Sequence, residues 1–209
     1  MKIIVWNSQD KCVADYHRLI RGCDVLCLLD CGQWTVPMYA LQIQKGLFHW
    51  KVEHEGLSYD IFYCLEKVAF VCRDGLYSGE SVLYSIHSNI GSLIGIRLQD
   101  DFWLFAHHEP NLVNAYHIGE FYLREISDRF RKAAFIADFK KKSYSWVQET
   151  VGKLYCIALP EGYYPHTVNY LFTIHVACTD LYLLEGYSET SNQPTFFEFG
   201  ETDDNADEN

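Results

Sequence analysis

The sequence has 209 residues, of which 49% are hydrophobic and 22% are charged, and its formal net charge is -11. This length and apolar fraction fit one folded globular domain with a sizeable core. The negative balance argues against a protein whose main task is non-specific adhesion to nucleic acid or anionic membrane, because such adhesion needs clustered lysine and arginine.

The hydrophobic pattern predicts many strands and two helices. A strand at "KIIVWN" precedes helical spacing between residues 9 and 22, and a second strand follows at "DVLCLLD". Short strands separated by turns fill residues 47 to 107, and helical spacing returns from Ala115 to Phe130. The last predicted strands are "AAFIADF", "KLYCIAL", "TVNYLFTI" and "DLYLL". This order predicts an α/β fold in which two sheets pack face to face with helices outside.

The chain shows no linker that would divide it, so we predict one domain over residues 1–199. The acid-rich residues 200–209 have nothing to bury and are predicted to form a disordered, solubilising tail. No apolar run approaches the roughly 20 residues of a membrane span, and no signal peptide precedes the first strand. Most of the eight cysteines lie in apolar strands without zinc-site spacing, which favours a reduced, cytoplasmic protein. Secretion of a processed form stays open.

Polar residues stand at or near the ends of predicted strands, where a core strand has no use for them. They are Asn7, Asp30, Arg73, His107, Asp138 and Asn169. Taken singly, each is typical of a turn, a cap or a hydrogen-bonded core position. Because two packed sheets bring strand ends together at one edge, the group as a whole is the candidate functional site.

In this order, these residues resemble the endonuclease/exonuclease/phosphatase superfamily, the DNase I-like fold, and within it the catalytic subunit of cytolethal distending toxins. The stretches that carry the resemblance are "WNSQ", "DVLCLLDCG", "KVAFVCR", "LIGIRLQDDFWLFAHH", "FIADFK" and "HTVNYLFT". The resemblance implies a four-layer α/β sandwich, with two packed mixed β-sheets flanked by helices.

The resemblance also implies roles for the strand-end residues. Asn7 and Asp30 match the metal-contacting positions, and His107 matches the histidine that stabilises charge. Asp138 matches the residue that orients water and the transition state. Arg73 falls on the arginine of the family's third motif, and Asn169 falls on an aspartate that supports the catalytic base.

Several family residues are replaced in this chain. Asp30 stands for a glutamate, Lys140 for an asparagine, Asn169 for an aspartate, Gly91 for an arginine, and Ser191-Asn192-Gln193 for the final S-D-H. Asn169 and Gln193 accept no proton at neutral pH, and a positioned base contributes typically about 10²- to 10⁴-fold. His166 and His175 flank Asn169 and offer a substitute base as a minor alternative.

The sequence therefore predicts a catalytically degenerate protein that acts by binding, as a regulatory, inhibitory or toxin-complex component. It needs no cofactor, and its partner is another protein. The alternative is a divalent-metal-dependent nuclease or phosphoesterase with a rearranged active site, which would use Mg²⁺ and act on nucleic acid or a phosphoinositide. An unrelated mixed α/β domain with coincidental matches is the third interpretation.

The stretch "FIADFKKKS" suggests how a metal would be replaced. Asp138 and Lys140 are two residues apart and lie on the same side of an extended strand. We hypothesise that the Lys140 ammonium takes the place of the metal among the carboxylates. A solvated basic turn and a phosphate-binding turn are the alternatives for these lysines.

Overall fold

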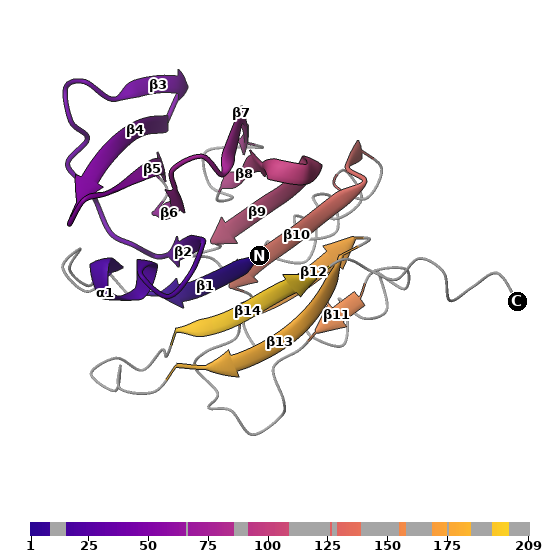
Figure 1. Ribbon diagram of the computed structural model, residues 1–209. Helices are drawn as coiled ribbons and strands as arrows, with labels where there is room; N and C mark the ends of the chain where they lie inside the picture. Colours follow the sequence, from indigo (N-terminus) through magenta and orange to yellow (C-terminus); the bar gives the residue numbers. More distant parts are fainter. Residues whose placement is uncertain are drawn as a thin grey trace, which may run out of the picture.

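Two β-sheets form most of the structure (Figure 1). The computed structural model describes residues 1–8, 16–65, 67–85, 92–108, 126, 129–138, 155–157, 169–174, 176–184 and 194–200. Among these residues the larger sheet has eight strands, in the order β13-β14-β1-β2-β6-β5-β4-β3. The smaller sheet has six, in the order β11-β12-β10-β9-β8-β7.

The strands of the larger sheet are β1 (Lys2–Asn7), β2 (Val25–Leu29), β3 (Leu41–Gln44), β4 (Leu47–His54), β5 (Leu57–Cys64), β6 (Val68–Arg73), β13 (Ala177–Leu183) and β14 (Thr195–Gly200). Those of the smaller sheet are β7 (Tyr77–Ser85), β8 (Ser92–Leu98), β9 (Phe102–His108), β10 (Lys132–Asp138), β11 (Tyr155–Ile157) and β12 (Asn169–Ile174). The helical elements are α1 (Tyr16–Ile20) and a 3₁₀ turn, η2 (Gln99–Asp101).

Both sheets are mixed. In the larger one, β1 pairs with β2 in parallel, and in the smaller one β9 pairs with β10 in parallel. The neighbouring pairs β1–β14, β2–β6, β8–β9 and β10–β12 are antiparallel. Each sheet therefore has a central parallel pair whose carboxyl ends finish at the same edge.

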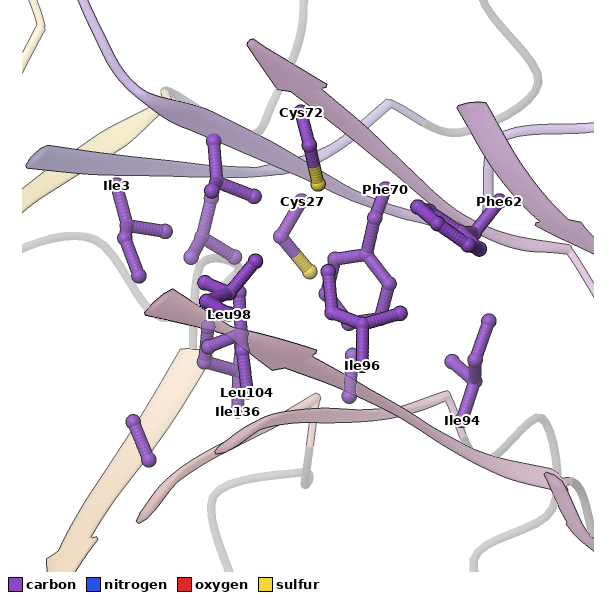
Figure 2. Close-up of a cluster of buried hydrophobic side chains, with 14 of the residues drawn as sticks. Ile3, Cys27, Phe62, Phe70, Cys72, Ile94, Ile96, Leu98, Leu104 and Ile136 are labelled. Carbon is purple, nitrogen blue, oxygen red and sulfur yellow. The ribbon is translucent and has the colours of Figure 1, made fainter. Parts of the chain in front are cut away.

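The core between the sheets follows the alternation of side chains along the strands. In the larger sheet, Ile3, Cys27 and Phe70 lie on the face that meets the smaller sheet. Ile94 and Leu104 face them from the smaller sheet (Figure 2). Burying this surface is the main driving force for pairing the two sheets.

The other face of the larger sheet is covered by α1. Leu19 and Ile20 of the helix are buried in one cluster with Ile4 and Leu26 of the sheet. The predicted helix between residues 9 and 22 is thus confirmed over Tyr16–Ile20, and residues 9–15 lie outside the described part of the chain.

A second helix, predicted from Ala115 to Phe130, falls mostly outside the described residues. The amide of Phe130 donates a hydrogen bond to the carbonyl of Ile126, a helical spacing. The Phe130 ring contacts Trp103 and Phe105 of β9, with ring centroids 4.8 Å apart in both cases.

The structure adds two strands that the sequence pattern did not predict. Strand β3 is short and half polar, and it lies exposed at the edge of its sheet. Strand β14 lies between β13 and β1, and its last residue is Gly200, which was assigned to the tail. In the described part of the chain, no helix is long and apolar enough to cross a membrane.

Candidate functional site

Strand-end residues from both sheets lie at one edge, with Arg73 as the exception. Asn7 ends β1 opposite Leu29 of the parallel strand β2, and Asp30 follows at once. In the smaller sheet, Asp138 ends β10 opposite His108 of β9. The backbone register places Asn169, the first residue of β12, opposite Asp138 on its other side.

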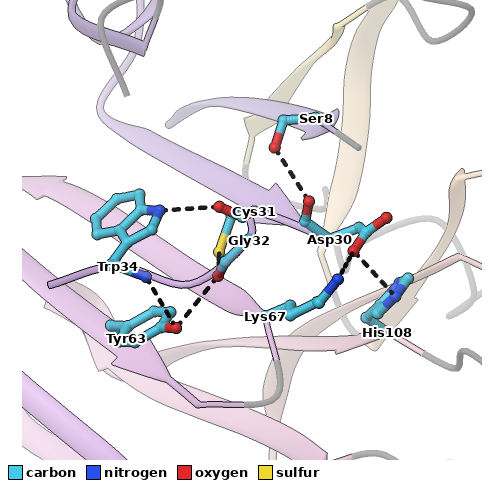
Figure 3. A network of polar contacts seen from close by, with 8 residues as sticks. All are labelled: Ser8, Asp30, Cys31, Gly32, Trp34, Tyr63, Lys67 and His108. Carbon is cyan, nitrogen blue, oxygen red and sulfur yellow. Dashed lines mark hydrogen bonds and ion pairs between the residues drawn. The ribbon is translucent and has the colours of Figure 1, made fainter. Parts of the chain in front are cut away.

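The Asp30 carboxylate connects the two sheets. Its Oδ1 atom lies 3.1 Å from Nζ of Lys67 and 3.8 Å from Nε2 of His108 (Figure 3). Lys67 precedes β6 of the larger sheet, whereas His108 ends β9 of the smaller one. The side chains of Lys67 and Asp30 are 38% and 23% exposed, so a ligand can reach both.

Backbone conformation determines where Asp30 and Lys67 lie. Both residues have positive φ, 48° for Asp30 and 70° for Lys67. This left-handed region costs an L-residue with a side chain roughly 1–2 kcal/mol. At Asp30 the turn interrupts the strand alternation, because residue 30 would otherwise point away from the face that carries Leu29.

Lys67 is held on both sides by the larger sheet. Its amide donates to the carbonyl of Cys64 over 3.0 Å, and its carbonyl accepts from the amide of Cys31, also over 3.0 Å. The antiparallel register pairs Leu29 with Val68, so Asp30 and Lys67 are the next residues on their two strands. The sheet itself therefore presents the ammonium to the carboxylate.

The loop after Asp30 is braced by aromatic side chains. The Tyr63 hydroxyl donates to the carbonyl of Gly32 over 3.2 Å and accepts from the amide of Trp34 over 3.1 Å. The Trp34 indole donates to the carbonyl of Cys31 over 3.0 Å. Its ring stacks between those of Tyr16 and Tyr63, with centroids 5.6 Å away in both cases. These contacts keep the loop, and with it Asp30, in one arrangement.

The two adjacent histidines of β9 have different surroundings. His107 is fully buried. Strand alternation puts it on the same face as Trp103 and Phe105, while His108 shares the inter-sheet face with Ala106. His107 carries the family's catalytic role in the sequence prediction, yet His108 is the one of the pair that faces Asp30, at 3.8 Å.

The structure does not bring Arg73 into this group. Arg73 ends β6 beside Asp24, at the opposite end of β2 from Asp30, roughly 20 Å along the strand. Its guanidinium donates to the carbonyl of Cys23 over 3.1 Å and lies 3.7 Å from the Asp24 carboxylate. In this position Arg73 fastens the start of β2.

Lys140, the predicted metal replacement, lies outside the described residues, as do Gln193 and the other residues of the altered S-D-H. The lysine that the structure does place on Asp30 is Lys67, which the sequence analysis missed. It follows "YCLE" at a turn before a strongly apolar strand. Pairing that strand with β2 would have placed Lys67 beside Asp30.

The described residues do not fit a divalent ion at Asp30 while Lys67 is in place. Mg²⁺ takes oxygen ligands at about 2.0–2.1 Å in octahedral geometry. Here Oδ1 of Asp30 already has an ammonium at 3.1 Å. In the part of the chain that the structure describes, no group of three or more His, Cys, Asp or Glu is arranged to hold a metal ion.

Solved structures resemble this chain over almost its whole length. TDP2 from D. rerio, in complex with a single-strand DNA product, has a TM-score of 0.59 at 13% identity, covering 96% of this chain and 98% of that one. The human Nocturnin catalytic domain, with a bound sulfate anion, has a TM-score of 0.59 at 14% identity, with coverages of 97% and 94%. An endonuclease/exonuclease/phosphatase from Beutenbergia cavernae has a TM-score of 0.57 at 12% identity, with coverages of 96% and 71%.

No protein-family model matches the sequence, and a sequence search of curated proteins finds no relative. The structural likenesses show that the chain has the fold of the endonuclease/exonuclease/phosphatase superfamily, the DNase I-like fold. The finer resemblance to the toxin subunit remains a prediction.

Proposed function

We propose that this chain binds and hydrolyses phosphate esters at the strand-end site, as a nuclease or phosphoesterase with a rearranged active site. The observation that carries the proposal is the meeting of Asn7, Asp30 and His108 with the Asp138–Asn169 register pair at one edge of both sheets. Ligands bind preferentially where such polar groups converge on a mostly apolar frame. Among the structural neighbours, TDP2 is in complex with a single-strand DNA product, which carries phosphates. The Nocturnin catalytic domain binds a sulfate anion, which resembles phosphate in shape and charge.

The residues of the site supply the chemistry that hydrolysis needs. The Lys67 ammonium and the Asn7 amide offer positive charge and a donor to the phosphate oxygens. The His108 imidazole lies beside Asp30 and supplies the general acid–base group: it accepts the proton of an attacking water and returns one to the departing alcohol. Water oxygen forms the new bond to phosphorus as the ester P–O bond breaks.

A second candidate is a protein that binds a phosphate-bearing ligand without turnover. Two observations favour it. Lys67 forms an ion pair with the Asp30 carboxylate, which would otherwise contact a metal. Asn169, an amide, stands where the resemblance expects a carboxylate. Binding without hydrolysis is the expected behaviour when charge is neutralised but no strong base is present.

Turnover assays separate the two candidates. Single-stranded and duplex DNA, a phosphomonoester and a phosphoinositide are incubated with the protein in Mg²⁺, in Mn²⁺ and in EDTA. We expect turnover that Asp138→Ala and His108→Ala reduce and that Glu53→Ala, a change at an exposed strand position, leaves unchanged. No turnover with any substrate, together with retained binding, would establish the non-catalytic candidate.

A further inference from the structure

We infer that the Lys67 ammonium is the built-in counter-ion of Asp30 and takes the place of a divalent metal, so that this site binds phosphate without one. The inference extends the proposed function, because it uses the same site. It moves the cation from Lys140, where the sequence suggested it, to the turn before β6.

The sheet backbone fixes the position of Lys67 next to Asp30. Its ammonium lies 3.1 Å from Oδ1 of Asp30. Its own amide and carbonyl are both hydrogen-bonded to the larger sheet, at Cys64 and Cys31. Because both ion-pair partners adopt a left-handed backbone conformation, the fold accepts local strain to bring these two side chains together.

The charges around Asp30 disfavour a divalent ion. The ammonium of Lys67 and the imidazole of His108 approach the same Asp30 oxygen from two elements. A metal ligated by this carboxylate at about 2 Å would lie within a few ångströms of the ammonium. Repulsion between the ion and a fixed positive charge at such a distance is strong in a partly desolvated site.

The positive charge nevertheless remains available to an anion. The Lys67 side chain is 38% exposed, and an ammonium carries three hydrogen-bond donors. A phosphate oxygen can therefore bind to Lys67 while the carboxylate stays in place. The expected ligand is a terminal phosphate or a phosphodiester, recognised without a metal bridge.

The test measures Mn²⁺ and inorganic phosphate binding directly. Free Mn²⁺ is followed by electron paramagnetic resonance during titration of wild type, Asp30→Asn, Lys67→Met and Lys51→Met. Lys51 is the matched control, because it is an exposed lysine that pairs with Asp74 at 2.6 Å outside the site. Calorimetry in EDTA then measures phosphate binding to the same proteins.

We expect wild type, Asp30→Asn and Lys51→Met to bind Mn²⁺ alike, and Lys67→Met to gain one site with affinity about tenfold or more above wild type. Phosphate binding in EDTA should be lost in Lys67→Met and kept in Lys51→Met. Should Lys67→Met fail to fold, Lys67→Gln is used, since it keeps a polar side chain of similar reach.

A Mn²⁺ ion that wild type binds and Asp30→Asn loses would overturn the inference, as would a folded Lys67→Met that gains no site. The failure of the proposed function looks different. If no substrate is turned over and phosphate still binds in EDTA, the proposed hydrolysis is contradicted, whereas the inferred role of Lys67 is not. Turnover that needs an Asp30-bound Mn²⁺ would support hydrolysis and overturn the role inferred for Lys67.

Discussion

Nε2 of His108 lies 3.8 Å from Oδ1 of Asp30, although the two residues belong to different sheets. Its neighbour His107 is fully buried and lies on the other face of β9. Adjacent histidines of one strand therefore have different surroundings: His108 lies beside Asp30, and His107 is packed within the smaller sheet.

The first prediction separates these two histidines. His108→Gln should lower turnover about 10²-fold, within the range of general acid–base catalysis, with little change in the urea midpoint. His107→Gln should lower the urea midpoint while the folded fraction keeps its turnover. Measuring turnover and urea unfolding on both variants decides the matter, and a loss of turnover confined to His107→Gln would restore that residue to the catalytic role.

A second prediction concerns the brace behind Asp30. Tyr63→Phe removes the hydroxyl that connects Gly32 and Trp34 and leaves two backbone groups without that partner. We expect a loss of about 1–3 kcal/mol in the free energy of unfolding, measured with urea. Tyr39→Phe is the control, since Tyr39 is 71% exposed. Equal effects of the two changes would contradict the bracing role.

The third prediction is a pH dependence of stability. Burial lowers the pKa of His17 below its usual 6.5, and the positive charges of His54 and Arg21 lower it further. The His17 and His54 rings stack with centroids 3.9 Å apart. Because the pKa is lower in the folded state, protonation favours the unfolded chain. The stability that the neutral His17 side chain contributes is therefore complete above about pH 6.5, and it is lost as the pH falls below that value.

We therefore expect the urea midpoint to decrease as the pH is lowered from 7.5 to 5. In His17→Asn the urea midpoint should depend less steeply on pH. His54→Asn should weaken this dependence as well, because the second cation is then absent. Identical slopes in wild type and both variants would show that the stacked pair does not contribute.

The fourth prediction is the inertness of the core thiols. Burial raises the pKa of Cys23 to about 12 and holds those of Cys27 and Cys72 well above the usual value. Since the thiolate is the reactive form, iodoacetamide at pH 7.5 should leave these three unmodified in the native protein. Cys178 is less buried and should react sooner. Mass spectrometry of native and urea-unfolded samples provides the comparison, and fast native labelling of Cys27 would be the contrary result.

Much of the fold was predictable from local pattern. The strands β4, β6 and β9 lie within a residue or so of the predicted stretches, because continuous or alternating apolar runs between turn residues specify them. Strand β3 escaped prediction because its alternation, LQIQ, is only four residues long and almost all of it is exposed. Strand β14 was missed although its aromatic residues are largely buried against its neighbours β1 and β13.

The candidate site was only partly predictable. Asn7, Asp30 and Asp138 were selected because each ends or directly follows an apolar strand, and the backbone register places all three at one edge. The approach of Lys67 to Asp30 depends on the register between β2 and β6 and on positive φ at both residues, and neither follows from the spacing of residues. Arg73 matched a motif, but the antiparallel direction of β6 carries it to the far end of the sheet.

The pairing of β1 with β14 has a consequence for biosynthesis. Strand β1 lies between β2 and β14, so one of its edges stays open until Thr195–Gly200 has left the ribosome. During translation, strand β1 therefore has an unpaired edge that is exposed to other nascent chains until β14 has been synthesised. Shielding of this edge until Thr195–Gly200 has been synthesised should therefore raise the yield of folded protein.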